Sequence, residues 1–498
     1  MVFTSWAFVK FLAIVVLGLR VMPTRMLRQL LILVASAYFY AYWEPAYLLL
    51  LATPSLIDYW CAIAIENSGN ARVRKRWLLF SLVSNLGLLA YFKYTGFFAD
   101  TIAGLLDLRQ PDLEIVLPVG ISFFTFKTLS YTIDVYRREI PACRNLWQYA
   151  MFVAYFPELV AGPIVRASVF LPQMTRSLKL AWPRTLVGLQ IILLGVTKKL
   201  VIADRLAPFV DAIFAAPSLY SPWTVGSAVI AYSLQIYCDF SGYSDIAIGV
   251  SRIIGFDLPE NFNMPYAATS ITDFWRRWHM TLSSWLRDYL YIPLGGNRKG
   301  PLRTYVNLML TMLLGGLWHG ANWTFVLWGL LHGVGLAAHK LWGTLFPGHR
   351  RPFGGVVGWA LTYAFACFTW VFFRSPDFST AVVIVRKLAF IDRAGVEWVY
   401  SPLWIILPLV VFGHFIGLTA SRQAKIARTP RRIPAPAWAA GAYASVRNRF
   451  ALKPHPAAGV YVLLPLRSAA GVFVLTLWIA CLYFFAALQT SPFIYFQF

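Results

Sequence analysis

Long apolar runs recur from one end of this chain to the other, and they limit what it can fold into. A helix needs about 20 mostly apolar residues to cross the hydrocarbon core of a bilayer. Fourteen runs approach or exceed that length, at residues 5–19, 30–52, 53–66, 77–99, 115–135, 146–165, 185–203, 223–250, 304–318, 322–346, 355–374, 379–391, 401–419 and 466–488. Several are too short to cross alone, so we expect about ten to twelve true spans, with re-entrant or interfacial helices making up the rest.

Composition supports the same fold class. Of the 498 residues, 59% are hydrophobic and 13% are charged, and the charged share is about half that of an ordinary soluble domain. This excludes a soluble enzyme, a disordered chain and a fibrous protein. We therefore predict an all-α polytopic membrane protein.

No internal repeat or low-complexity tract divides the chain, so we expect residues 1–498 to form a single integral membrane domain. The first run, with no basic residue before it, is expected to be an anchor and not a removed signal peptide.

The charge balance is strongly basic, with 44 Lys and Arg against 21 Asp and Glu, a net charge of +23. The basic residues lie in short loops beside apolar runs, which is typical of cytoplasmic loops and of attraction to anionic lipid headgroups. Membrane lipids are therefore the expected partner, and nucleic acid is not. The largest polar segment, 421–465, is basic and interrupted by prolines, which predicts a cytoplasmic loop on the membrane surface.

Metal chemistry is not indicated. The five cysteines are scattered and form no CxxC pair, so we expect no disulfide framework and no zinc or iron–sulfur site. We predict no bound metal and no cofactor.

Residues 257–300 differ from the rest of the chain. Ser270 or Thr272 can cap a helix there. One face of that helix would carry Trp275, Trp278, His279, Leu282, Trp285, Leu286 and Tyr289. This spacing predicts an amphipathic helix lying along the membrane interface. His279 lies in the middle of this apolar stripe, where a lone histidine is usually a packing residue, so a functional role needs a second feature that points to chemistry.

The second feature is the apolar run 305–336. Besides Tyr305, its titratable side chains are His319 and His332, and an ionisable residue inside a membrane is a candidate functional group. Flanking glycines would let substrate or backbone approach His319 closely, and Trp318, Asn322 and Trp323 would line the site. His332 has fewer polar neighbours and is assigned to packing.

Two histidines in an apolar setting suggest acid–base chemistry. A neutral imidazole can take the proton of an attacking hydroxyl near pH 7. The sequence contains no GxSxG, GxxxxGK[ST] or HExxH motif, which excludes the usual serine hydrolase, nucleotide triphosphatase and zinc protease sites. A carboxylate that orients His319 would have to come from another segment. Asp239 and Asp245 are candidates, and buried structural hydrogen bonding explains them equally well.

Two long histidine-centred segments and the C-terminal residues resemble a known family. The strings FNMPYAATSITDFWRRWHMTLSSWLRDYLYIPLGGNRKG and GGLWHGANWTFVLWGLLHG, with the ending FIYFQF, resemble the membrane-bound O-acyltransferase family. Within it they are most similar to the bacterial alginate O-acetyltransferase branch, which is related to the D-alanyl transfer protein of teichoic acid modification. The resemblance implies a ring of tilted helices around a central tunnel. It matches His319 to the family's essential histidine, and His279 to a second, more variable position.

The resemblance also implies an activity. We expect acetyl transfer from a cytoplasmic thioester, with acetyl-CoA as donor, to an acceptor outside the bacterial inner membrane for exopolysaccharide acetylation. A periplasmic acetyltransferase with a serine nucleophile is the expected partner. His319 would be the general base. His279 would hydrogen-bond the thioester carbonyl or orient the acceptor, with Trp278 as a further substrate contact.

Two further expectations stay open. Arg298 and Lys299, with backbone N–H groups of Gly295 and Gly296, could bind the phosphates of coenzyme A, or they could serve as a positive-inside anchor. The runner-up function is a transporter or flippase of an acyl carrier or polysaccharide, and a third is a scaffold for polysaccharide secretion. Alginate, cellulose and other exopolysaccharides all fit as the acceptor polymer.

Overall fold

The computed structural model describes residues 1–109, 115–176, 178, 180–347, 354–428, 464, 466, 468–487 and 491–494, without the side chains of 354 and 422–428. Within these ranges the chain is helical, and the β-structure is one isolated bridge between Tyr220 and Val396. The all-α prediction is confirmed. The predicted loop 421–465 lies mostly outside the described residues, and its first residues, up to Arg428, continue a helix.

The helices follow one another in three groups. The first group is α1 (Trp6–Val21), α2 (Arg25–Ala41), α3 (Tyr47–Asn67), α4 (Ala71–Leu89), η1 (Ala90–Tyr94), α5 (Thr95–Leu105), α6 (Ile121–Tyr136), α7 (Leu146–Ala154), α8 (Phe156–Leu159) and α9 (Ala167–Met174). The second is α10 (Trp182–Thr197), η2 (Lys198–Ala203), α11 (Asp204–Ala215), η3 (Pro217–Leu219), α12 (Pro222–Ile254), η4 (Pro265–Ala267), α13 (Ile271–Trp275), α14 (Met280–Leu286) and η5 (Arg287–Tyr291). The third is α15 (Gly300–His319), α16 (Trp323–Leu345), α17 (Gly354–Arg374), α18 (Phe378–Leu388), α19 (Ser401–Arg428) and α21 (Ala469–Phe485).

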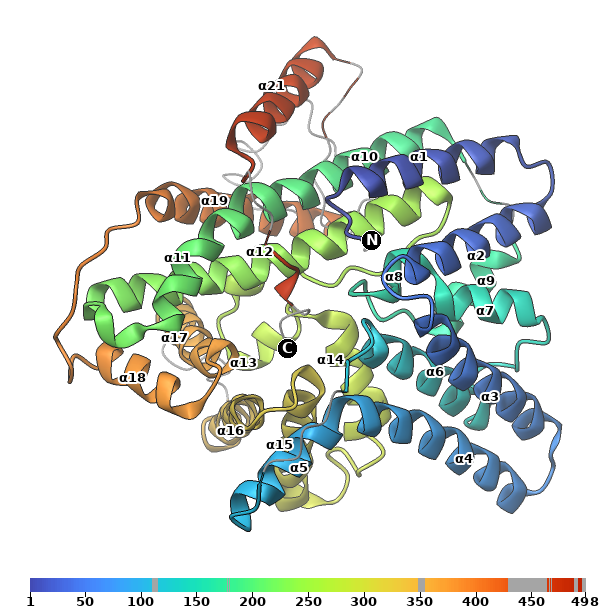
Figure 1. The fold of residues 1–498 in the computed structure, drawn as a ribbon, viewed down its shortest axis with the longest axis horizontal. Helices are drawn as coiled ribbons and strands as arrows, with labels where there is room; N and C mark the ends of the chain where they lie inside the picture. The colour runs from blue at the N-terminus through green and yellow to red at the C-terminus, as the bar shows by residue number, and fades with distance from the viewer. Residues whose placement is uncertain are drawn as a thin grey trace.

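Helix α12 runs through the middle of the molecule (Figure 1) and is buried along almost its whole length. Ser221 caps its first turn, Pro222 occupies the first helical position, and Gly255 ends it in the left-handed conformation, as helix ends prefer. It packs closely on α10 because glycines face each other: a Cβ at Gly188 would lie 2.6 Å from the carbonyl oxygen of Gly249. Small residues at such contacts are typical of helices that associate in membranes.

Five helical segments of the described chain are long and apolar enough to cross a membrane: Tyr47–Asn67, Ala71–Leu105, Trp182–Ala215, Gly355–Arg374 and Ser401–Ser421. The protein is therefore a multi-pass membrane protein. The total of ten to twelve spans stays a prediction, since helices such as α1, α2 and α6 have only 16 or 17 residues.

The predicted amphipathic helix differs from the expectation in two ways. Ser270 does cap its start, but the helix stops at Trp275, and His279 takes a left-handed conformation (φ 40°) before α14 begins. The backbone of the preceding loop causes the break, because Asn263 N donates to Arg277 O and Met280 N donates to Asn261 O. The predicted apolar stripe is also covered by protein, with every member 9% exposed or less. The apolar face of the segment therefore packs against the rest of the protein, whereas Arg276 and Arg287 are exposed. Its place along the membrane interface stays a prediction.

Candidate functional site

His319 is the last residue of α15 and is only 4% exposed. Aromatic rings surround its imidazole, with centroid distances of 5.0 Å to Trp318, 5.1 Å to Trp328 and 5.3 Å to Phe373. The helix end is held against α16 by glycine: a Cβ on Gly316 would collide with the carbonyl oxygen of Phe325. The close approach that we expected at these glycines is therefore made by backbone, and it fixes the position of His319.

A cavity of about 160 Å³ opens beside His319. Its polar lining comes from Lys93, Ser122 and His319, and its other walls are Leu117, Pro118, Val119, Gly120, Ile121, Phe123, Val160 and Trp318. Gly120 has a positive φ of 81°, and a Cβ there would strike the carbonyl oxygen of Leu159. A glycine at this position lets the start of α6 meet the end of α8 and close one side of the cavity.

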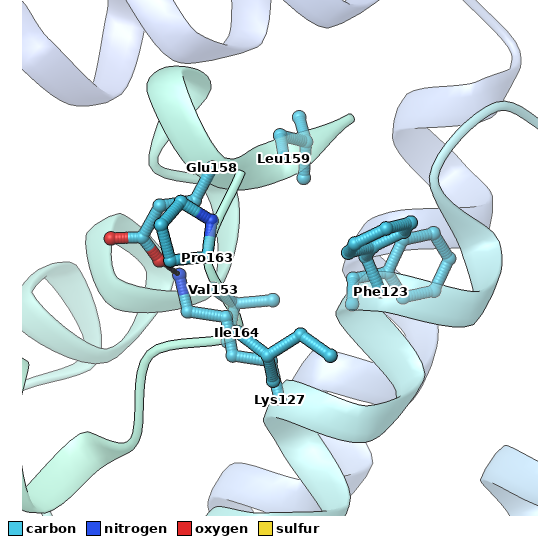
Figure 2. Close-up of a pocket in the computed structure, with 8 residues that line it drawn as sticks. Phe123, Lys127, Val153, Glu158, Leu159, Pro163 and Ile164 are labelled. Atoms are coloured by element: carbon cyan, nitrogen blue, oxygen red, sulfur yellow. Dashed lines mark hydrogen bonds and ion pairs between the residues drawn. The ribbon is translucent and has the colours of Figure 1, made fainter. Parts of the chain in front are cut away.

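A buried ion pair joins α6 and α8, the two helices that close this side of the cavity. Lys127 Nζ on α6 lies 2.6 Å from Glu158 Oε2 on α8, with both side chains almost fully buried. Figure 2 shows this pair beside a smaller cavity, with Phe123 on its far side. Phe123 lines both cavities. The pair therefore ties together the two elements that shape the space next to His319.

His279 is fully buried, and its tautomer follows from its neighbours. Its Nδ1 lies 3.0 Å from Asn261 Oδ1. That oxygen also accepts from the hydroxyl and the backbone amide of Thr281, while Asn261 Nδ2 donates to Ser244. Because Oδ1 can only accept, Nδ1 of His279 must carry the proton. Its Nε2 is then a lone-pair acceptor, and this buried atom has no hydrogen-bond partner among the described residues.

The fold brings the two histidines together although 40 positions separate them in the sequence. Their ring centroids are 6.5 Å apart, and Trp318 lies 6.1 Å from His279 and 5.0 Å from His319. Phe240 of α12 packs edge-on against His279 at 4.7 Å. Of the two imidazoles, only that of His319 lines the cavity. A neutral imidazole in such an aromatic setting can take the proton of a hydroxyl bound in the cavity.

Asp239 and Asp245, the candidate orienting carboxylates, are bound elsewhere. Asp239 Oδ1 lies 2.8 Å from Lys199 Nζ, and its Oδ2 accepts from Ile494 N at 2.7 Å. Asp245 pairs with Lys198 at 2.7 Å. The structure thus favours the buried structural role for both, and Asp239 anchors the C-terminal segment to α12. The sequence could not choose between the two roles because the partners lie far along the chain.

Three other residues that were predicted to contact substrate do not line the cavity beside His319. Asn322 caps α16 by accepting from Thr324 N, and its amide donates to Pro376 O. Trp323 is 49% exposed, so neither residue lines the cavity beside His319. Trp278 is buried and stacks on Phe274 at 5.6 Å, adjoining His279 in the chain without lining that cavity.

The predicted donor-binding turn is exposed. Arg298 and Lys299 both lie at the surface. The N–H groups of Gly295 and Gly296 already donate to the carbonyls of Ile292 and Tyr291. The expectation that these two amides are free for an anion is therefore wrong, and only the side-chain charges remain available.

His332 is a packing residue, as expected. Trp275 Nε1 donates to its Nδ1 at 3.2 Å, and its Nε2 lies 3.1 Å from Thr369 Oγ1. Two residues that contact the histidines were not predicted from the sequence. Asn261 gave no signal, since its link to His279 depends on a loop. Lys93 did give one, because it is a charged residue inside the apolar run 77–99.

Comparison with known proteins points in one direction. The family model for MBOAT, the membrane-bound O-acyltransferase family, matches residues 47–375. Probable alginate O-acetylase AlgI of Pseudomonas aeruginosa is 44% identical over 390 residues, covering 76% of this chain and 73% of its own length. The protein of the same name from Pseudomonas putida is 38% identical over 516 residues, covering all of both chains. Peptidoglycan O-acetyltransferase of Helicobacter pylori is 38% identical over 386 residues, covering 72% of this chain and 73% of its own length.

The matched region contains both histidines and the cavity beside His319. Relatives named for acetyl transfer, together with this arrangement, identify the chain as an O-acyltransferase enzyme. The chain belongs to the membrane-bound O-acyltransferase family.

Proposed function

We propose that this enzyme moves an acetyl group from acetyl-CoA on the cytoplasmic side of the bacterial inner membrane to an acceptor on the outer side, in the acetylation of an alginate-like exopolysaccharide. The observation that carries the proposal is the pairing of His319, which lines a small cavity, with His279, whose ring centroid lies 6.5 Å from that of His319. Relatives named for alginate and peptidoglycan acetylation support a polysaccharide-linked acceptor.

His319 acts as the general base in this proposal. It takes the proton of the acceptor hydroxyl, whose oxygen forms a bond to the acetyl carbonyl carbon. The carbon–sulfur bond of the thioester breaks, and the leaving thiolate receives the proton back from His319. A positioned base of this kind contributes about 10²–10⁴-fold to a rate.

His279 orients the acceptor. Its protonated Nδ1 is engaged by Asn261, so Nε2 can accept a hydrogen bond but cannot donate one in the neutral ring. Of the two roles expected from the sequence, this geometry favours orienting the acceptor over polarising the thioester carbonyl. Because the reacting hydroxyl has one proton, which goes to His319, Nε2 of His279 accepts from a different donor group of the acceptor. The surrounding aromatic rings exclude water, which limits hydrolysis of the thioester.

The cavity beside His319, of about 160 Å³, has room for an acetyl group of three heavy atoms. The relatives named for acetyl transfer support acetyl as the transferred group. Arg298 and Lys299 remain our proposed contacts for the phosphates of coenzyme A, through their side-chain charges. A periplasmic acetyltransferase with a serine nucleophile remains the proposed partner.

The test is to reconstitute the purified protein in liposomes with acetyl-CoA labelled in the acetyl group, and to supply alginate on the opposite side. We expect labelled alginate, or labelled acetate where the partner is missing. Passage of intact acetyl-CoA or alginate across the membrane, without cleavage of the thioester, would contradict the proposal and favour a transporter.

A further inference from the structure

The segment Ala90–Tyr94 is a π-helical turn between α4 and α5. It lies inside a helical stretch, Ala71–Leu105, that is long and apolar enough to span a membrane. Single π-turns inside helices occur often at functional sites. This one carries Lys93, and a cation in such a stretch is costly unless the protein provides it with partners.

The partners of Lys93 are at the end of the helix that carries His319. Lys93 Nζ donates to the carbonyl oxygens of Trp318 at 2.6 Å and His319 at 3.1 Å. Its neighbour Tyr94 donates from its hydroxyl to the carbonyl oxygen of Leu317 at 2.8 Å. The two side chains therefore bind three consecutive carbonyls.

These carbonyls belong to the group that a helix leaves unpaired at its C-terminal end. The remaining one, of Gly316, accepts from the amide of Gly320. All four terminal carbonyls of α15 are thus satisfied, three of them by the π-turn. An ammonium group at this end also meets the negative pole of the helix dipole, which stabilises both.

A second contact fixes the same dipeptide from α6. Trp318 Nε1 lies 3.4 Å from the carbonyl oxygen of Ser122, and Lys93 Nζ lies 3.4 Å from Ser122 Oγ. Lys93, Ser122, Trp318 and His319 all line the cavity of about 160 Å³. The clamp therefore acts at the wall where the reaction is proposed to occur.

We infer that the π-turn Ala90–Tyr94 is a clamp that positions His319, with Lys93 and Tyr94 as positioning residues for acyl transfer. The inference rests on the proposed role of His319 as base. Lys93 acts through the helix end and not on substrate, because its three N–H bonds are directed at the Trp318 carbonyl, the His319 carbonyl and the Ser122 hydroxyl. A displacement of the base by about 1 Å can cost about 10²-fold in rate.

The kinetic arm compares Lys93→Met, Lys93→Arg and Tyr94→Phe with wild type, using labelled acetyl-CoA. We expect kcat to fall about 10- to 100-fold in Lys93→Met, with the KM for acetyl-CoA nearly unchanged, and to recover largely in Lys93→Arg, whose guanidinium can donate to two carbonyls. Tyr94→Phe should show a smaller fall. Tyr59→Phe is the matched control, because it removes a tyrosine hydroxyl bond to the carbonyl of Arg144.

The structural arm measures amide hydrogen exchange in the peptide that covers residues 312–324. Exchange should speed up about tenfold in Lys93→Met, since the helix end loses its partners. It should not change in Lys387→Gln, which alters another lysine bound to a backbone carbonyl, that of Ala394. This measurement does not depend on enzyme activity. It therefore tests whether Lys93 holds the end of α15 even if wild type fails to transfer acetyl and the proposed function is wrong.

Three results would overturn the inference. One is a folded Lys93→Met protein with wild-type kcat. Another is unchanged exchange at residues 312–324 in that variant. A rise in the KM for acetyl-CoA with constant kcat would also contradict it, because that outcome would place Lys93 in donor binding.

Discussion

Replacing Asn261 with alanine tests how His279 is held. Asn261 Oδ1 accepts from the Nδ1 of His279 and from the hydroxyl of Thr281, at 3.0 and 2.9 Å, and all three residues are buried. The substitution removes the acceptor of these two side-chain donors and of the more distant Thr281 amide at 3.4 Å, and each buried side-chain donor left unpaired costs about 1–3 kcal/mol. We therefore expect the free energy of unfolding to fall by about 2–6 kcal/mol.

Catalysis should suffer beyond that loss of stability, because the Nδ1 proton of His279 is no longer fixed and Nε2 ceases to be a dependable acceptor. We expect kcat to fall about 10- to 100-fold under conditions where the variant is still folded. Asn261→Asp should retain more activity than Asn261→Ala, since a carboxylate still accepts from Nδ1. The assays are thermal unfolding in detergent and transfer from labelled acetyl-CoA.

The matched control is Asn85→Ala. Asn85 is equally buried and bonds to Asp58, Ser81 and Thr128, so its loss should destabilise the protein by a similar amount. Its folded variant should keep a nearly normal kcat. Wild-type kcat in folded Asn261→Ala, or an equal fall in kcat for Asn85→Ala, would show that Asn261 does not hold His279 for catalysis.

Three further outcomes are expected. Reversing Arg298 and Lys299 to Glu should weaken acetyl-CoA binding in equilibrium titrations while membrane orientation persists, and unchanged affinity would leave this pair a topology role. Gly316→Ala should lower the unfolding temperature because its methyl group meets the backbone of α16, whereas Gly87→Ala, with open space around it, should not. Transfer should fall on acidification as the histidine base takes up a proton. Asp239→Asn should leave that pH profile unchanged, because the Asp239 oxygens are occupied elsewhere, and a shifted profile would contradict this assignment.

Much of the site could be predicted because an ionisable group in an apolar run has few explanations. His319 was found from its position alone, and His279 from its place in an aromatic stripe. The members of the stripe were predicted correctly, since period and apolarity decide which residues avoid water. Their burial by protein was not predicted, because the stripe was assigned to the membrane interface.

What the sequence could not provide was the set of contacts between distant segments. The helix break at His279 depends on backbone bonds from the loop at Asn261 and Asn263. The pairing of Asp239 with Lys199 and the C-terminal segment likewise joins residues far apart in the chain. The prediction of one continuous helix over residues 270–289 was wrong, because hydrogen bonds from a distant loop outweighed the local helical periodicity.

The central claim is that His319 is the base for acetyl transfer in this membrane-bound enzyme. The most direct test is transfer from labelled acetyl-CoA by wild type and His319→Ala, reconstituted at equal amounts and shown to unfold at the same temperature. We expect His319→Ala to lose about 10²–10⁴-fold in rate while membrane insertion is unchanged. A well-folded His319→Ala protein that transfers acetyl at the wild-type rate would contradict it.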